Sequence, residues 1–152
     1  MFMNTAELSK VIIYDQDRLI SKWVGDKLGI YDFGPCTTIG VARDGEIIAG
    51  AVYGNYHLDN SGKPLSIEVT IVSIDKTWLD RHILSTLFGY PFTRLKVRRV
   101  QLTTAKRNKE LRIMFERLGF KFEGVLRKAW RGGGDAVVYS MLPHECSWIK
   151  KG

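Results

Sequence analysis

Residues 108–142, NKELRIMFERLGFKFEGVLRKAWRGGGDAVVYSML, decide the fold, because a helix and a strand hairpin can be read from them without a gap. Asn108 is of a type that commonly caps a helix, and Gly119 stands where a helix commonly ends. Between them the apolar residues fall on one helical face: Leu111, Met114, Phe115 and Leu118. Two runs typical of strands follow at 121–130 and 136–142, joined by a glycine-rich loop. The stretch therefore predicts one helix and then an antiparallel strand pair.

Upstream of this stretch, similar patterns predict five more strands and two more helices. The first helix begins at Asp15, with Asp17 and Arg18 in its first turn, and the second follows Asp80. Pro91 is expected to end or bend the second helix near its last turn. The strands are predicted over residues 10–14, 37–43, 47–57, 65–74 and 97–104, with a tight hairpin turn at Asp44-Gly45.

The predicted order of elements is β-α-β-β-β-α-β-α-β-β, which is a mixed α/β arrangement. Strands that follow one another through short turns favour a largely antiparallel central sheet, with the helices packed on both of its faces. The chain has 152 residues and shows no internal repeat, low-complexity stretch or linker. We therefore expect a single domain that spans residues 1–152.

The composition is that of an ordinary globular protein, with 45% hydrophobic and 26% charged residues. No apolar run approaches the length needed to cross a bilayer, and the first residues do not resemble a signal peptide. Cys36 and Cys146 make neither a disulfide framework nor a metal-ligand spacing, and the three histidines are scattered. These features predict a cytoplasmic protein without a membrane anchor or a metal site.

Charge is distributed unevenly along the chain, whose net charge is +7. Residues 76–131 hold 15 Lys and Arg against 4 Asp and Glu, a net charge of +11, so the rest of the chain carries −4. A basic second half favours an anionic ligand, for which a nucleotide cofactor, RNA and DNA are candidates. A solubilising surface explains the same charge without any ligand.

The stretch that decides the fold also resembles the C-terminal signature of the GNAT acetyltransferase superfamily, in the branch that acetylates the N-termini of ribosomal proteins. More loosely, the chain is similar to small GNAT-like proteins of tailed phages. The residues that match the branch at the right spacing are Asn108, Leu111, Leu118-Gly119-Phe120, Phe122-Glu123-Gly124, Arg127, Asp135 and Tyr139-Ser140-Met141-Leu142. With the element order, the resemblance extends over nearly the whole chain. It implies a GNAT-like acyl-CoA N-acyltransferase fold and transfer of an acetyl group from acetyl-CoA to a primary amine.

The upstream half departs from the family pattern at the loop that holds the cofactor pyrophosphate. The family has an acidic residue, an apolar strand and then Gln/Arg-x-x-Gly-x-Gly/Ala at the start of a helix. Glu68 meets the acidic position, whereas Trp78, Arg81 and Ile83 stand at the Gln/Arg and the two small positions. Backbone N–H groups at the helix start would then bind phosphate without glycines, with the charge of Arg81 and His82 replacing close approach. An ordinary strand-to-helix loop is the alternative.

The resemblance also implies the remaining cofactor contacts. The backbone at the end of the cofactor strand would pair with the pantetheine amides, and one of its N–H groups would polarise the thioester carbonyl. Asn108 would contact the pantetheine arm, although a helix cap explains the same residue, and Arg112 is one of several basic residues near the 3′-phosphate. The predicted acetyl-CoA contacts are Val72, Ser73, Ile74, Leu79, Asp80, Arg81, His82, Ile83, Asn108 and Arg112.

The reaction needs a base, because an exposed amine is mostly protonated at neutral pH. Glu68 is the candidate, acting directly or through a water, since it is the only acid within its apolar strand. A solvent-facing side chain or an ion pair is the alternative for Glu68. Many family members protonate the leaving thiolate with a Tyr where this chain has Phe115. Tyr139 or Ser140 is the candidate substitute; otherwise water or the departing ammonium supplies the proton.

The acceptor is expected to lie across the first helix, the hairpins and the last two strands. Aromatic side chains would line its site, although aromatics at these spacings also build cores, and an arginine would attract an acidic acceptor. The predicted acceptor residues are Trp23, Tyr53 and Arg127, with Tyr31, Tyr56, Trp130 and Arg131 as further candidates.

Three functions fit these observations. The first is acetylation of a protein or peptide α-amine, a lysine or a small amine, by direct attack in a ternary complex. The second is acetylation of the amino acid on a charged tRNA, for which the basic second half would supply phosphate contacts. The third is a binding or inhibitory protein that kept the fold without the chemistry, which the missing glycines and tyrosine favour. The resemblance also suggests a homodimer formed along the final strands.

Overall fold

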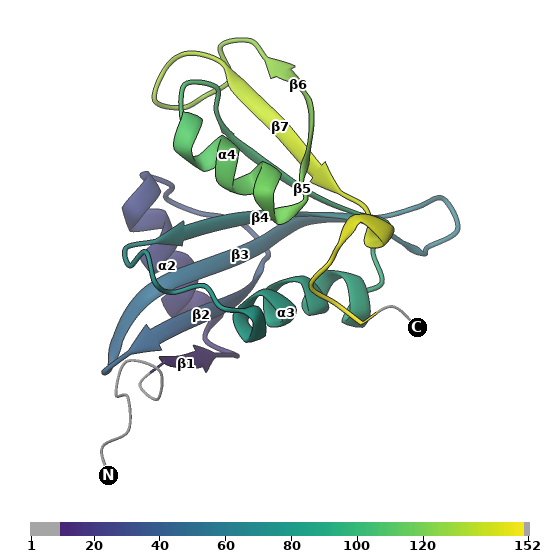
Figure 1. Cartoon of the computed structure of the whole chain (residues 1–152). Helices are drawn as coiled ribbons and strands as arrows, with labels where there is room; N and C mark the ends of the chain where they lie inside the picture. Colours follow the sequence, from purple (N-terminus) through teal and green to yellow (C-terminus); the bar gives the residue numbers. More distant parts are fainter. Residues whose placement is uncertain (1–9, 151–152) are drawn as a thin grey trace. The chain divides into compact units, whose positions relative to one another are not determined.

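The computed structural model describes residues 10–150, and Figure 1 shows their helices and strands. Within this range the elements follow the predicted order. The strands are β1 (Lys10–Ile13), β2 (Thr37–Arg43), β3 (Glu46–Leu58), β4 (Pro64–Ser73), β5 (Arg99–Ala105), β6 (Lys121–Leu126) and β7 (Ala136–Met141). The helices are α2 (Asp17–Leu28), α3 (Arg81–Gly89) and α4 (Lys109–Leu118), with a π-helical turn η1 (Tyr90–Arg94) and a short 3-10 turn η2 (Pro143–Glu145).

The strands of the described range form one seven-stranded sheet, in the order β1-β2-β3-β4-β5-β7-β6. The pairs β1–β2, β2–β3, β5–β7 and β6–β7 are antiparallel, and β4–β5 is parallel. A parallel pair needs a crossover connection, which α3 provides between β4 and β5. The predicted fold class, mixed α/β with a mostly antiparallel sheet, is therefore confirmed.

The chain divides into two compact units. Unit 1 comprises residues 1–55 and 69–87, and unit 2 comprises residues 56–68 and 88–152. Three elements, β3, β4 and α3, begin in one unit and end in the other.

In unit 1, α2 packs closely on the sheet because glycines face it. Ile20 and Val24 of this helix are fully buried and form a cluster with Val52 of β3. A Cβ at Gly40 would lie 2.4 Å from Cδ1 of Ile20, and a Cβ at Gly50 would lie 2.7 Å from Cγ2 of Val24. Neither distance is tolerated unless the Ile20 or Val24 side chain or the helix itself moves, so the absence of a Cβ at the two glycines allows α2 to come this close.

On the other face of β3, unit 1 is covered by α3. Tyr53 is only 2% exposed, and its hydroxyl donates to the Leu87 carbonyl of α3 at 2.6 Å. Ile83, Leu84 and Leu87 of α3 are all buried, so this helix turns an apolar face to the core. Since neighbouring side chains on a strand point to opposite faces, Val52 contacts the α2 side and Tyr53 the α3 side.

In unit 2, α4 covers β7. The ring of Phe115 lies 6.0 Å from that of Phe120 and 5.9 Å from that of Tyr139, which is fully buried. Asn108 caps α4 through its Oδ1, which accepts from the Leu111 N–H at 3.2 Å. Gly119 ends the helix with a φ of 111°. Both predicted ends of this helix are therefore confirmed.

Of two other helix ends, one differs from its prediction. Asp15 has a φ of 58° and lies in the turn before α2, so the helix begins at Asp17. The predicted effect of Pro91 is confirmed, because the α-helix ends at Gly89 and the chain continues as the π-helical turn, in which the Leu95 N–H donates to the Tyr90 carbonyl at 3.0 Å. Pro91 stands at the start of this wider turn, where its missing N–H costs little.

Candidate active site

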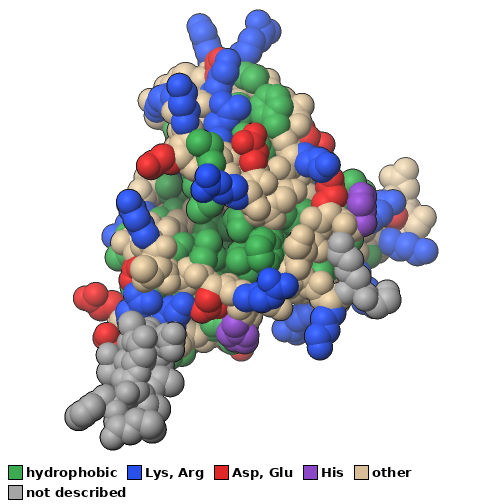
Figure 2. Space-filling view, viewed as in Figure 1, with side chains coloured by type: hydrophobic (Ala, Val, Ile, Leu, Met, Phe, Trp, Pro, Cys, Tyr) green, Lys and Arg blue, Asp and Glu red, His purple; other side chains and the backbone are tan. Residues whose placement is uncertain are grey.

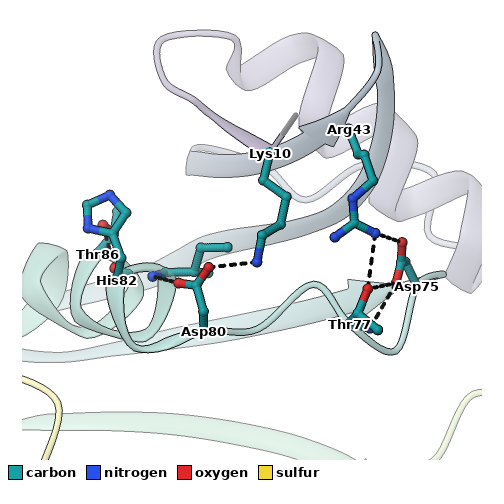
Figure 3. A network of polar contacts seen from close by, with 8 residues as sticks. Lys10, Arg43, Asp75, Thr77, Asp80, His82 and Thr86 are labelled. Atoms are coloured by element: carbon teal, nitrogen blue, oxygen red, sulfur yellow. Dashed lines mark hydrogen bonds and ion pairs between the residues drawn. The ribbon is translucent and has the colours of Figure 1, made fainter. Parts of the chain in front are cut away.

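The loop between β4 and α3 is held at three points in unit 1, of which Figure 3 shows the polar contacts of Asp75 and Asp80. At its start, the Asp75 carboxylate accepts from the Arg43 guanidinium and from the backbone N–H of Thr77. In its middle, Trp78 is 4% exposed and serves as a core anchor. At its end, Asp80 pairs with Lys10 of β1. These contacts fix where α3 begins and where its first backbone N–H groups point.

Asp80 caps α3 with its own carboxylate. Oδ1 accepts from the Ile83 N–H at 2.8 Å, and Oδ2 lies 2.6 Å from Nζ of Lys10, whose side chain is mostly buried. Leu84 donates its N–H to the Asp80 carbonyl at 3.0 Å, which is the first intrahelical bond. An anion that belongs to the protein therefore occupies part of the helix N-terminus.

Both loop carboxylates are held in the charged form. Hydrogen bonds from the Thr77 side chain and backbone, with the nearby Arg43, hold the pKa of Asp75 below its ordinary value. Burial alone would raise the pKa of Asp80, but the bonds from Lys10 and the Ile83 N–H outweigh it and lower that pKa. At neutral pH the loop thus carries two negative charges beside the predicted phosphate site.

The Asp80 cap reduces the number of backbone N–H groups that are available for the predicted pyrophosphate contact. Of the five backbone amides expected to face the phosphates, from Leu79 to Ile83, that of Ile83 is engaged by Asp80. Arg81 and His82 are exposed in the first turn of α3, where their charge can reach an anion. Asp80 itself, predicted as a backbone contact, instead presents a negative charge that opposes phosphate binding.

The pairing of β4 with β3 also reduces the number of backbone N–H groups at the end of β4 that are available for the predicted pantetheine contact. The Ile74 N–H donates to the Ile48 carbonyl of β3 at 2.9 Å. Because successive backbone N–H groups along a strand point to opposite edges, the Ser73 N–H points away from β3, and that of Val72 points towards it. Val72 packs its side chain against the α2 cluster. Among Val72, Ser73 and Ile74, only Ser73 therefore turns its backbone N–H away from the neighbouring strand.

In unit 2, Glu68 is half-buried on β4 and lies opposite Gln101 of β5. The same face carries a charged cluster, in which Nη2 of Arg99 donates to Oε1 of Gln101 at 2.7 Å and to Oε1 of Glu123 at 2.6 Å. The bond from Arg99 lowers the pKa of Glu123, and the Ser140 hydroxyl adds to the effect. Glu68 thus lies beside polar neighbours on a sheet face, and its role as a base remains a prediction.

Tyr139 lies beneath α4 and is fully buried. Its hydroxyl accepts from Nε of Arg112 at 3.0 Å and lies 3.5 Å from Oε1 of Glu116. Full burial and the bond from Arg112 argue against the predicted role of Tyr139 as the general acid and favour a role in the core. Ser140 is 4% exposed and bonds Glu123, which leaves it equally enclosed.

The two residues predicted at α4 also have structural roles. Arg112 donates from Nη1 to the Lys106 carbonyl at 2.9 Å, and its guanidinium carbon lies 5.7 Å from the ring centre of Phe122. The guanidinium is therefore clamped by Tyr139, Lys106 and Phe122, which argues against the predicted contact with a 3′-phosphate. Asn108 is exposed while it caps the helix.

The three predicted acceptor residues have different surroundings. Trp23 is half-buried on α2, with Nζ of Lys27 5.2 Å from its ring centre. Tyr53 is a core residue bound to α3, so it is withdrawn as an acceptor contact. Arg127 is exposed and lines an open pocket of about 640 Å³ with Val125, Leu126, Lys128 and Asp135.

Sequence reasoning missed Lys10, Arg99 and Glu123 as members of the candidate site. Lys10 is far from Asp80 in sequence, so no local pattern signals their contact. Arg99 and Glu123 lie on different strands, and their pairing follows from the register of the sheet. Within residues 10–150, no group of His, Cys, Asp or Glu side chains is arranged to hold a metal ion, and no helix is long and apolar enough to span a membrane.

The sequence matches no protein-family model and no curated protein. The fold, in contrast, is shared with many solved structures. One is an acetyltransferase of the GNAT family from Streptococcus pneumoniae, at a TM-score of 0.67 and 15% identity over 88% of this chain and 99% of that one. Another is yncA from Salmonella typhimurium, solved with its cofactor acetyl-CoA, at a TM-score of 0.65 and 12% identity over 91% and 96% of the two chains.

A third similar structure is the ribosomal-protein-S5-alanine acetyltransferase from Vibrio fischeri. It matches at a TM-score of 0.61 and 17% identity, over 86% of this chain and 70% of that one. The chain therefore has the fold of the GNAT acetyltransferases. At these identities the likeness establishes the fold, and the function has to be argued from the site.

Proposed function

We propose that this chain is an acetyl-CoA-dependent N-acetyltransferase that acts on a primary amine. The observation that carries the proposal is the shared fold, which in yncA holds acetyl-CoA. The sequence signature over residues 108–142 supports the same chemistry by resemblance. The favoured acceptor is a protein or peptide α-amine or a small amine, as for the enzyme from Vibrio fischeri that is named for a ribosomal-protein alanine.

The start of α3 would hold the cofactor phosphates. Arg81 and His82 are exposed there, and guanidinium groups form strong charge-assisted bonds with phosphate. The Asp80 carboxylate opposes such binding, and its pairing with Lys10 offsets part of that charge. The site therefore fits a phosphate through side-chain charge rather than through glycine backbone.

The end of β4 would hold the reacting thioester, which acetyl-CoA supplies as an activated acyl group. The Ser73 N–H points away from β3 and is the backbone donor available to a carbonyl oxygen there. Such a donor stabilises the negative charge that develops on that oxygen when an amine attacks. The contribution of Ser73 rests on its backbone, so its side chain is free to vary.

Glu68 would accept the proton that the amine loses, directly or through a water. A half-buried carboxylate remains accessible to an amine or to a water that enters from solvent. With Tyr139 enclosed beneath α4, the leaving thiolate would take its proton from water or from the ammonium formed in the attack.

Asp80 favours a second candidate function, a protein that keeps the fold and does not bind acetyl-CoA. The carboxylate already satisfies one N–H at the start of α3, so this helix end does not need an external anion. Titration of acetyl-CoA separates the two candidates. Saturable binding supports the enzyme, and a lack of binding by the folded protein supports the alternative.

A screen of acceptors then tests the reaction itself. Thiol release from acetyl-CoA would be followed with peptides that differ in their N-terminal residue and with small amines. Turnover that depends on a free amine, and stops when that amine is blocked, is the expected result. Binding of acetyl-CoA with no turnover on any amine would contradict the proposed transfer.

A further inference from the structure

Two loops of unit 2 gather basic side chains at one end of α4. The first covers residues 106–109 and the second residues 127–135; together we call them the basic loop pair. They hold six Lys and Arg against a single acid, Asp135. All six basic residues are exposed. Figure 2 shows Lys and Arg side chains projecting at the upper end of the view, where the loop after β6 lies.

Hydrogen bonds join the two loops into one surface. The Lys106 N–H donates to the Asp135 carbonyl at 2.9 Å, and the Arg107 guanidinium donates to the Gly133 carbonyl. The carboxylate of Asp135, which is the one acid of the basic loop pair, accepts from the Lys128 backbone N–H at 2.9 Å. The positive charges are thus held close together with little internal neutralisation.

An aromatic ring lies among these charges. The guanidinium carbon of Arg131 is 4.6 Å from the ring centre of Trp130, and a Cβ at Gly132 would lie 3.4 Å from Nη2 of Arg107 and 3.5 Å from the Trp130 ring. Trp130 is half-buried, so part of its ring is accessible. The bond from Arg107 to Gly133 uses one of the five N–H donors of that guanidinium.

We propose that the basic loop pair binds a single-stranded nucleic acid, with the Lys and Arg side chains on its phosphates and Trp130 stacked on a base. Closely spaced positive charges match a phosphate chain, and guanidinium groups bind phosphate through two parallel bonds. An aromatic ring among the charges favours a single strand over a duplex, because the unpaired bases of a single strand are free to stack on the ring. This binding does not depend on the proposed acetyl transfer.

Fluorescence anisotropy of a labelled single-stranded RNA of mixed sequence, titrated without acetyl-CoA, tests the proposal. We expect saturable binding that weakens steeply with salt. The triple variant Arg127→Glu, Lys128→Glu, Arg131→Glu should weaken binding at least about tenfold and reduce the salt slope by about 2, since each single-strand phosphate contact contributes about 0.7. Trp130→Ala should weaken it about tenfold, and Trp130→Phe should restore most of the loss.

A matched control separates a site from general charge. Lys63→Glu, Arg94→Glu and Arg117→Glu change the net charge equally at exposed positions of unit 2 outside the basic loop pair. The control should keep affinity within about threefold of the wild type. Equal losses in both triple variants would overturn the proposal, as would an RNA that does not bind in low salt.

Three further arms identify the ligand. Single-stranded DNA in place of RNA shows whether the sugar matters, and either strand binding at the basic loop pair supports the proposal. Saturating coenzyme A that displaces the RNA would assign these charges to the cofactor and overturn it. The proposal would also be overturned if the protein binds anionic lipid vesicles and binds neither single-stranded RNA nor single-stranded DNA. Circular dichroism confirms that each variant is folded.

Discussion

The Lys10 ammonium lies 2.6 Å from Oδ2 of Asp80, and the other oxygen of that carboxylate caps α3 at the Ile83 N–H. A single carboxylate thereby ties β1 to the start of the helix at which we propose that phosphate binds. In the proposed enzyme, the same side chain stabilises unit 1 and weakens the binding of acetyl-CoA.

Replacement of Asp80 by Ala should destabilise the protein in a pH-dependent way. Loss of a helix cap costs about 1 kcal/mol, measured as the free energy of unfolding at pH 7. The folded-state pKa of Asp80 is lowered, so its charge stabilises the fold above the ordinary Asp value of about 3.9 and this contribution is lost as the pH falls through the lowered folded value. The difference in the free energy of unfolding between wild type and variant should shrink as the pH falls below about 4. A difference that stays constant over that range would contradict this role.

Replacement of Asp80 by Ser should strengthen binding of acetyl-CoA. The hydroxyl can still cap α3, and the negative charge beside the phosphates is removed. We expect the Kd to fall about twofold to fivefold, which corresponds to the usual contribution of about 0.3–1 kcal/mol from a charge at a helix end. Calorimetry measures it, with Asp75→Ser as a control that alters the neighbouring carboxylate. An unchanged or higher Kd for Asp80→Ser would show that phosphate does not approach this helix end.

Replacement of Glu68 by Gln should lower kcat at least about 100-fold, with the KM for acetyl-CoA within about threefold of the wild type. The reason is that an amide cannot accept the proton of the amine. Glu123→Gln is the matched control, because Glu123 is a carboxylate of the same sheet face held by Arg99. Equal falls in kcat for both variants would assign the loss to the face as a whole and not to a base at Glu68.

Replacement of Tyr139 by Phe should lower stability and leave the chemistry intact. The variant loses the bond to Arg112 and leaves its Nε without that acceptor, at a cost of about 1 kcal/mol in the free energy of unfolding. The value of kcat should stay within about twofold of the wild type, measured with the best amine of the screen. A 100-fold fall in kcat at unchanged stability would restore Tyr139 as the acid.

Much of the fold could be predicted from local signals. Asn108 and Gly119 mark both ends of α4 because capping and a positive φ are properties of a few neighbouring residues. The hairpin turn at Asp44-Gly45 follows for the same reason, with φ values of 52° and 81°. These signals do not depend on tertiary contacts with the rest of the chain, so they can be recognised from the sequence alone.

The site could be predicted less well, because its contacts join distant residues. Arg112 is predicted to contact the 3′-phosphate of the cofactor, but its guanidinium donates to the buried hydroxyl of Tyr139 and to the Lys106 carbonyl. The close approach of α2 at Gly40 and Gly50 likewise depends on tertiary packing. The π-helical turn that accommodates Pro91 after the end of α3 is likewise not predicted from the sequence.

Calorimetric titration of acetyl-CoA into wild type, Arg81→Glu and the control Lys76→Glu tests the central claim most directly. Lys76 is exposed in the same loop, so its reversal changes the net charge equally. We predict saturable binding with a Kd below about 1 mM, weakened at least about tenfold by Arg81→Glu and less than about threefold by Lys76→Glu. Absence of saturable binding by the folded wild-type protein would contradict the proposed enzyme and leave the chain as a protein that keeps the fold without its cofactor.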